Sequence, residues 1–375
     1  MPEPFKNLFN SKLIIGIGEN ISKAWSPFDA TGFNAAASKN LDTLELKQRS
    51  AQISDALTTF LPSDYEKSAT ILLASLAPAE DCDAFNSTVY DNGLAGWAIM
   101  PLTHYVSRHG LNHFDLSMML LKEMTKRSSS EFDIRTFLLD SPQRTLSVLQ
   151  EWTQDPNQHV RRLASEGSRP RLPWAMRLPM FIEDPSPLIP LLDALKDDDE
   201  EYVRRSVANN LNDIAKDHPD VVARIAGDWL KGASKNRQRL VRHACRTLIK
   251  QGHKATLAAL GYRAPSAKLN HLKILTPQVT LGNALSFELA LESTSDTSQP
   301  LIIDYAIHHR KANGTTSPKV FKWKTITLEP LKTLTSERKH SMQKITTRVY
   351  YPGVHSLEIL INGVPFGSKE FCLNI

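Results

Sequence analysis

The chain has 375 residues, of which 41% are hydrophobic and 23% are charged, and these values fit a globular protein large enough for two domains. No run approaches the ~18–20 apolar residues that a membrane-spanning helix requires, so we expect no membrane association. The formal net charge is +5, and the whole excess falls in residues 266–375, which hold 13 basic and 8 acidic residues.

The N-terminal sequence has no basic segment followed by an apolar run, so we expect no secretory signal. The three cysteines, Cys82, Cys245 and Cys372, are far apart and form neither a CxxC pair nor a Cys/His spacing typical of zinc sites. We therefore expect a cytoplasmic protein without a bound metal.

Residues 1–262 are predicted to be helical, because apolar residues recur at three- and four-residue spacing between short breaks rich in Pro, Gly or Asp. A motif also recurs: VRRLASE starts at Val160, VRRSVAN at Val203 and, more weakly, VRHACRT at Val241. The spacings are 43 and 38 residues, within or just below the range of HEAT and armadillo repeats. We expect a HEAT-like α-solenoid with a binding groove.

From about residue 263 onward, apolar and polar residues alternate in short runs separated by turn sequences. Examples are the runs 273–279, 284–292 and 301–309. About seven short strands in this length indicate an immunoglobulin-like β-sandwich. The predicted domains are therefore 1–262 and 263–375.

The segment 157–177 combines unusual side chains. It holds one acid, Glu166, one tryptophan, Trp174, and five arginines: Arg161, Arg162, Arg169, Arg171 and Arg177. Such a segment is suited to bind a polyanion while placing a carboxylate against it.

On a helical wheel, Arg205, Asn209 and Asp213 form a column opposite the apolar face of their predicted helix. Arg162 and Glu166 occupy the corresponding positions one repeat earlier, so stacking of the repeats predicts a polar stripe across one surface. The alternative is a solvated i,i+4 pair between Arg162 and Glu166, worth only a few tenths of a kcal/mol.

Trp174 follows Pro170 and Pro173, which predicts a rigid connector that presents the indole beside the groove. The alternative is a tryptophan that covers the core between repeats. A second acid–aromatic pair is Glu131 and Phe132, and its alternative is an acid in the first turn of a helix.

Four segments, 4–14, 130–138, 160–175 and 197–222, resemble the AlkC-type DNA alkylation repair glycosylases, which are relatives of the AlkD-type enzymes. The resemblance covers essentially the whole chain and implies a HEAT-like solenoid followed by an immunoglobulin-like domain.

The resemblance implies base excision repair: removal of positively charged N3-alkylated bases, such as 3-methyladenine and 3-methylcytosine, from duplex DNA without base flipping. It implies alkylated double-stranded DNA as the partner. We expect no cofactor and association with the bacterial nucleoid when on DNA, and a clamp that wraps around DNA suggests a monomer. Matching the motifs residue by residue, the site would contain Glu131, Phe132, Arg162, Glu166, Trp174 and Asp213.

We expect catalytic roles for Glu166, Glu131, Trp174 and Asp213, with Glu166 as the first and Glu131 as the second candidate to face the sugar. The expected DNA-binding residues are Phe132, Arg161, Arg162, Arg169, Arg171, Arg205 and Asn209. A solenoid groove is not expected to contain a deep pocket. The competing hypothesis is a non-catalytic HEAT-repeat scaffold that binds DNA or a protein partner.

Overall fold

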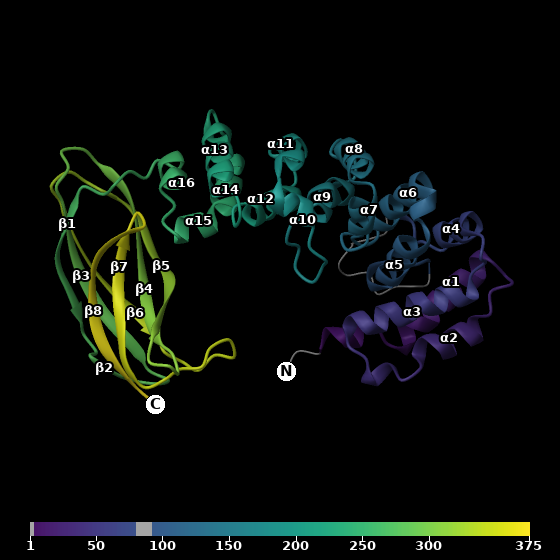
Figure 1. Cartoon of the computed structure of the whole chain (residues 1–375), viewed down its shortest axis with the longest axis horizontal. Helices are drawn as coiled ribbons and strands as arrows, with labels where there is room; N and C mark the ends of the chain where they lie inside the picture. The colour runs from purple at the N-terminus through teal and green to yellow at the C-terminus, as the bar shows by residue number, and fades with distance from the viewer. Residues whose placement is uncertain (1–3, 80–91) are drawn as a thin grey trace. The chain divides into compact units, whose positions relative to one another are not determined.

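The computed structural model describes residues 4–79 and 92–375 (Figure 1). Cys82 lies outside the described residues. The chain divides into two compact units, Met1–Ile214 and Ala215–Ile375. The predicted domain border after residue 262 lies near the change from helix to strand, whereas the compact units divide about 50 residues earlier, for a reason given below.

The first unit is helical (Figure 1). In its described residues the α-helices are α1 (Ser11–Ala24), α2 (Ala30–Ser38), α3 (Leu46–Phe60), α4 (Tyr65–Ala74), α5 (Ile99–His109), α6 (Phe114–Thr125), α7 (Ile134–Asp140), α8 (Pro142–Trp152), α9 (Gln158–Gly167), α10 (Pro179–Glu183), α11 (Ile189–Leu195) and α12 (Glu201–Ile214). Short 3-10 turns include η1 (Phe5–Leu8), η2 (Leu41–Thr43), η4 (Gly96–Ala98), η5 (Leu111–His113) and η6 (Ser186–Leu188).

Local sequence explains where these helices begin. The side chains of Asn10 and Asn157 accept hydrogen bonds from the first turns of α1 and α9, which satisfies backbone donors that have no partner inside the helix. Pro142 and Pro179 are the first residues of α8 and α10, where a backbone N–H would have no partner inside the helix.

The second unit starts with α13 (Pro219–Leu230), α14 (Lys235–Ala244), α15 (Arg246–Lys250) and α16 (Lys254–Ala259). Residues 264–375, described without a gap, then form β1 (Ala267–Ile274), β2 (Gln278–Thr280), β3 (Ala284–Ser293), β4 (Gln299–Arg310), β5 (Thr316–Leu328), β6 (Thr333–Ser341), β7 (Gly353–Ile361) and β8 (Val364–Asn374).

These strands make two sheets that face each other (Figure 1). One sheet has the order β1-β3-β6, and the other has the order β2-β8-β7-β4-β5, with β2 and β8 parallel and the other pairs antiparallel. Their inner faces share one core, built around Phe287, Tyr305 and Ile359. Alternate residues of β7 are buried, as expected for a strand with one face on the core.

The last helices pack against the sandwich, which explains why the compact units divide early. Leu257 and Tyr262 form a buried cluster with Ile302 of β4. Gly252 and Gly363 meet so closely that a Cβ on Gly363 would lie 2.3 Å from the Cα of Gly252. Residues 249–262, which include α16, thus share a small core with the strands.

The structure differs from the sequence predictions in three details. The helix predicted over 237–249 is interrupted at Cys245, between α14 and α15. The strand predicted over 273–279 is two strands, because β1 ends at Ile274 and β2 begins at Gln278. Residues 264–375 contain eight strands, whereas about seven were predicted.

Candidate active site

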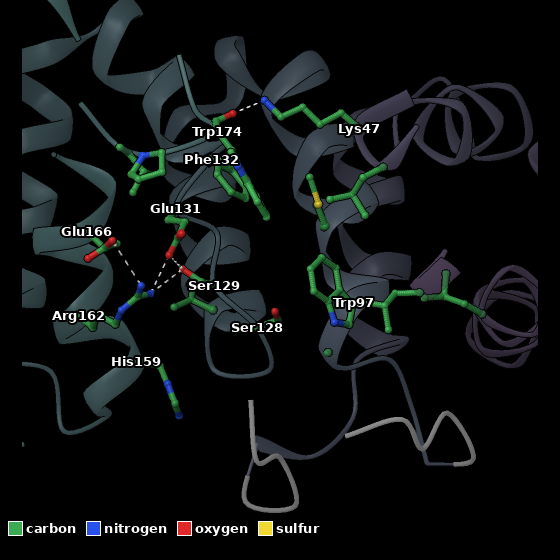
Figure 2. A pocket seen from close by; sticks show the side chains of 18 of the residues that line it. Lys47, Trp97, Ser128, Ser129, Glu131, Phe132, His159, Arg162, Glu166 and Trp174 are labelled. Atoms are coloured by element: carbon green, nitrogen blue, oxygen red, sulfur yellow. Dashed lines mark hydrogen bonds and ion pairs between the residues drawn. The ribbon is translucent and has the colours of Figure 1, made fainter. Parts of the chain in front are cut away.

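A cavity of about 700 Å³ lies in the first unit (Figure 2). Its walls come from the starts of α1 and α3, from η4, from the turn before α7, from α9 and the connector after it, and from α12. The expectation that this groove has no deep pocket is therefore wrong. The periodicity of one helix does not show how far apart neighbouring helix ends lie.

An arginine of α9 joins two carboxylates at the cavity wall (Figure 2). Nη1 of Arg162 donates to Oε2 of Glu131 at 2.7 Å, and its Nη2 lies 3.6 Å from Oε1 of Glu166. The guanidinium also lies over the ring of Tyr202, 4.8 Å from its centroid. Burial lowers the pKa of Arg162, but Glu131 and Glu166 outweigh burial and raise the pKa above its ordinary value.

Glu166 is 5% exposed, and both of its oxygens have partners. Oε1 accepts from Nη1 of Arg169 at 2.7 Å, and Oε2 accepts from the hydroxyl of Ser206 at 2.6 Å. Nε of Arg169 donates in turn to Oδ2 of Asp213 at 2.9 Å. Burial lowers the pKa of Arg169, but Glu166 and Asp213 raise it by more, so this group stays cationic. The alternative of a solvated surface pair does not hold for Arg162 and Glu166.

Glu131 has a different environment. It lies in the turn before α7 and therefore outside the helix, so the alternative of a first-turn acid does not hold. Its Oε2 accepts from Arg162 and from the hydroxyl of Ser129 at 2.8 Å. Within residues 4–79 and 92–375, no protein group donates to its Oε1. One oxygen of Glu131 is therefore available to a molecule in the cavity.

Trp174 stands at the mouth of the cavity and is 60% exposed, so it does not cover the core between repeats. Its φ of 65° is left-handed, which is unusual for a residue with a side chain. Its ring and that of Phe5 are arranged edge to face, with centroids 6.4 Å apart. Its carbonyl accepts from the ammonium of Lys47 in α3 (Figure 2). The predicted rigid connector thus has contacts on both sides.

Trp97 of η4 faces the Arg162–Glu131 pair from the opposite wall (Figure 2). Its ring centroid lies 5.8 Å from that of Phe9 and 6.4 Å from that of Phe5. Sequence reasoning missed Trp97, since no charged or repeated residue marks its surroundings. Tyr202 and Ser206 were also missed, although their four-residue spacing could have placed them on one face of α12.

The whole chain can be superposed on a solved structure. Alkylpurine DNA glycosylase AlkC from Pseudomonas fluorescens, solved bound to DNA containing an abasic site analogue, matches with a TM-score of 0.88 and 40% identity over 100% of both chains. The uncharacterised protein YhaZ from Bacillus subtilis (strain 168) is 36% identical over 98% of each chain. The chain belongs to the AlkC-type family of DNA alkylation repair glycosylases.

Two family models agree with AlkC membership. The model described as DNA alkylation repair enzyme matches residues 128–269, and the model of the C-terminal Ig-like domain of YhaZ matches residues 268–375. Together with the AlkC structure, they confirm the predicted order of HEAT-like helices and an immunoglobulin-like sandwich.

The structure brings together most of the residues predicted from the AlkC resemblance. The lining of the cavity includes Glu131, Phe132, Arg162, Glu166, Arg169 and Trp174. Asp213 does not line it and is buried against Arg169. Asp213 therefore contacts one of the cavity-lining residues, Arg169, and its catalytic role stays a prediction.

Four predicted DNA-binding residues lie outside the cavity lining: Arg161, Arg171, Arg205 and Asn209. Arg161 is paired with Asp198 at 2.6 Å and also donates to backbone carbonyls. Arg205 is exposed, and Arg171 and Asn209 are half-buried. Their contacts with DNA stay predictions.

The predicted polar stripe needs a correction. The side of α12 that carries Ser206, Asn210 and Asp213 is buried against α9 and the connector that follows it, while Arg205 points elsewhere. The helical-wheel projection assumed that the face of α12 opposite its apolar side is exposed to solvent. In stacked repeats, the neighbouring helix pair covers much of that face.

The described residues bring together no group of three or more His, Cys, Asp and Glu side chains that could hold a metal ion. None of the helices in the described part of the chain has the length and apolar character that crossing a membrane requires.

Proposed function

We propose that this protein is a monofunctional DNA glycosylase that excises positively charged N3-alkylated bases, such as 3-methyladenine and 3-methylcytosine, from duplex DNA without base flipping. The observation that carries the proposal is the free Oε1 of Glu131 in a cavity bordered by Trp174, Phe132 and Trp97. The AlkC of Pseudomonas fluorescens, by its description an alkylpurine DNA glycosylase, supports it.

The chemistry suits a site with carboxylates. An N3-alkylated base is already cationic, so the C1′–N bond breaks with its electron pair moving to the base, which leaves neutral without protonation. The sugar develops oxocarbenium character, as in glycoside hydrolysis. The free oxygen of Glu131 stabilises that cation and accepts a proton from the water that attacks C1′.

In this proposal, Glu131 and Glu166 have different roles. Glu131 faces the deoxyribose, because one of its oxygens is free. Glu166, whose oxygens are both engaged, holds Arg162 and Arg169 in place. This order reverses the one proposed from the sequence, where Glu166 was the first candidate.

The aromatic residues add electrostatic stabilisation. The exposed ring of Trp174 and the ring of Phe132 present π faces to a cationic sugar. Lys47 already donates to the carbonyl of Trp174, which leaves it poorly placed to attack C1′ as an amine. Water is therefore the proposed nucleophile, and an abasic site in an unbroken strand is the proposed product.

Selectivity is proposed to come from the intrinsic lability of cationic lesions and not from reading an extruded base. Duplexes carrying 3-methyladenine, 3-methylcytosine or hypoxanthine test this. We expect excision of the two cationic bases, little excision of neutral hypoxanthine, and strand cleavage only after alkali. Efficient hypoxanthine excision would contradict the mechanism, and DNA binding without any excision would favour the scaffold.

The absence of base flipping has its own test. An unreactive 3-methyladenine analogue is placed beside 2-aminopurine, whose fluorescence rises when its neighbour unstacks. We expect no more rise on protein binding than with adenine in place of the analogue. A rise specific to the analogue would show that the cavity receives the base.

We also propose that the protein acts as a monomer in the cytoplasm, on the nucleoid. Sedimentation of the free protein and of its complex with a short duplex tests the monomer, since a second copy on one site would double the bound mass.

A further inference from the structure

A buried arginine that the mechanism does not use lies next to the site. Arg135, in the first turn of α7, is 0% exposed. Its Nη1 donates to the carbonyls of Gly167 and Arg169 at 2.8 and 2.7 Å. Its Nε and Nη2 both donate to the carbonyl of Met176, at 2.8 and 2.6 Å. One side chain therefore binds both ends of the connector that carries Trp174.

The guanidinium remains charged despite its burial. Burial and the neighbouring charge of Arg169 lower the pKa of Arg135 to about 10, while Asp213, Glu131 and Glu166 act in the opposite direction. An apolar side chain of similar volume would avoid the desolvation of a charge. What the guanidinium adds is a rigid planar fork that holds three carbonyls in one geometry.

The connector needs such a restraint. A left-handed backbone is strained for a residue with a side chain, so the φ of 65° at Trp174 persists only where the surroundings impose it. The contacts of Arg135 fall on both sides of Trp174 in the sequence. A further anchor is Gly167, where an added Cβ would lie 2.5 Å from Cγ2 of Ile134.

Arg135 also follows Glu131 by only four residues, so the same short segment carries the carboxylate and the clamp. We infer that Arg135 is a positioning residue: it fixes the ring of Trp174 relative to the carboxylate of Glu131. This inference rests on the proposed function for its kinetic consequence, but not for the placement of Trp174.

The position of the Trp174 ring can be tested without an activity measurement. The protein is labelled with 5-fluorotryptophan, and the ¹⁹F signal of Trp174 is assigned with Trp174→Phe. We expect Arg135→Lys, which lacks the fork, to shift or broaden that signal. The matched control is Arg127→Lys, because Arg127 is a buried arginine whose Nε donates to the carbonyl of Ala77. An unchanged Trp174 signal in Arg135→Lys overturns the inference.

The kinetic consequence is tested with a double-mutant cycle on single-turnover excision of 3-methyladenine. Arg135→Lys should slow excision by at least about tenfold, since a small misplacement of a positioned group is costly. In a Trp174→Ala background the same change should slow it by less than about twofold, because the two residues act as one unit. An equal loss in both backgrounds overturns the inference.

Two further outcomes are distinguishable. An inactive wild-type protein whose Trp174 signal still depends on Arg135 overturns the proposed function and supports the placement. If Arg135→Lys does not fold, Arg135→Met replaces it, because methionine has a similar volume and no charge. Thermal unfolding checks that this variant is folded. A shifted ¹⁹F signal of Trp174 then supports the inference, and an unchanged signal overturns it.

Discussion

Glu131 and Glu166 show how neighbouring groups assign different tasks to the same side chain. Glu131 keeps one oxygen free toward the cavity, and Glu166 has both oxygens bound by Arg169 and Ser206. A carboxylate with a free oxygen can contact a developing cation, whereas a fully engaged one serves to hold its partners.

This difference predicts different effects for the glutamine variants of the two residues. Glu131→Gln should slow excision of 3-methyladenine at least ~10²-fold, about 2.7 kcal/mol of barrier. It should lower the melting temperature less than Glu166→Gln does, because in the part of the chain that the structure describes Glu131 pairs with Arg162 alone. Glu166→Gln should slow excision and also lower the melting temperature, because it leaves Arg162 and Arg169 partly uncompensated in a buried place. Single-turnover rates and thermal unfolding measure both.

Glu123→Gln is the matched control, since Glu123 pairs with Lys126 and Arg127 and does not line the cavity. Full excision activity in Glu131→Gln would return the sugar-facing role to Glu166.

A second residue-scale prediction concerns Asp304 in β4. Burial raises the pKa of Asp304 to about 6, although the Trp323 backbone and Lys322 lower it. Its folded pKa exceeds its unfolded value, so its contribution to stability is greatest below about pH 4 and is lost as pH rises to about 6. From the linkage relation, the loss is about 2–3 kcal/mol.

Denaturant unfolding of the wild type and Asp304→Asn between pH 4 and 7 measures this contribution. The wild type should lose stability relative to the variant as pH rises. Parallel curves for the two proteins would contradict the raised pKa.

At the scale of elements, the end of α9 determines where the site can form. Gly167 closes α9 against Ile134 of α7, with no room for a Cβ. The next residues form the connector to Trp174, so the packing of two helices sets the position of a loop. Side chains on loops gain precision when rigid elements hold both ends.

Gly167→Ala should therefore destabilise the protein by about 1–3 kcal/mol through overpacking and reduce excision as the connector shifts. Gly227→Ala in α13 is the control, because the nearest atom to its added Cβ is 3.8 Å away. That control should stabilise its helix by about 0.5–1 kcal/mol. Equal melting temperatures for the two variants would argue against close packing at Gly167.

At the scale of the whole molecule, charge and packing divide the chain at the same place. Residues 1–214 hold 21 basic and 29 acidic residues, whereas residues 215–375 hold 24 basic and 11 acidic ones. Within the second part, Leu257 of α16 shares a small core with the strands. A cut after residue 262 would expose Leu257 and its neighbours, whereas a cut after Ile214 follows the division between the compact units.

The truncated protein 1–214 should consequently unfold cooperatively, while 1–262 should lose α13–α16 to limited proteolysis. Protein 1–214 should also bind duplex DNA more weakly and with a shallower dependence on salt, because it lacks residues 215–375, which hold 24 basic and 11 acidic residues. Binding titrations from 50 to 200 mM salt measure the slope. A slope equal to that of the full chain would show that residues 215–375 make no phosphate contacts.

Sequence periodicity predicted the order of helices and strands. The apolar residues on the buried face recur every three or four positions in a helix and every two positions in a strand. The motifs also identified Glu131, Phe132, Arg162, Glu166 and Trp174, which meet at one cavity. These predictions succeeded because they depend on local spacing or on whole motifs.

Only the tertiary structure decided which carboxylate oxygen is free, that Asp213 binds Arg169 outside the cavity, that Trp97 lines the cavity, and that Arg135 holds the connector beside it. These facts depend on pairs of residues tens of positions apart, such as Arg169 and Asp213, or Arg135 and Met176. Local periodicity shows which face of a helix is apolar. The stacking of one helix pair on the next decides which polar side chains that contact buries and which it leaves open to a ligand.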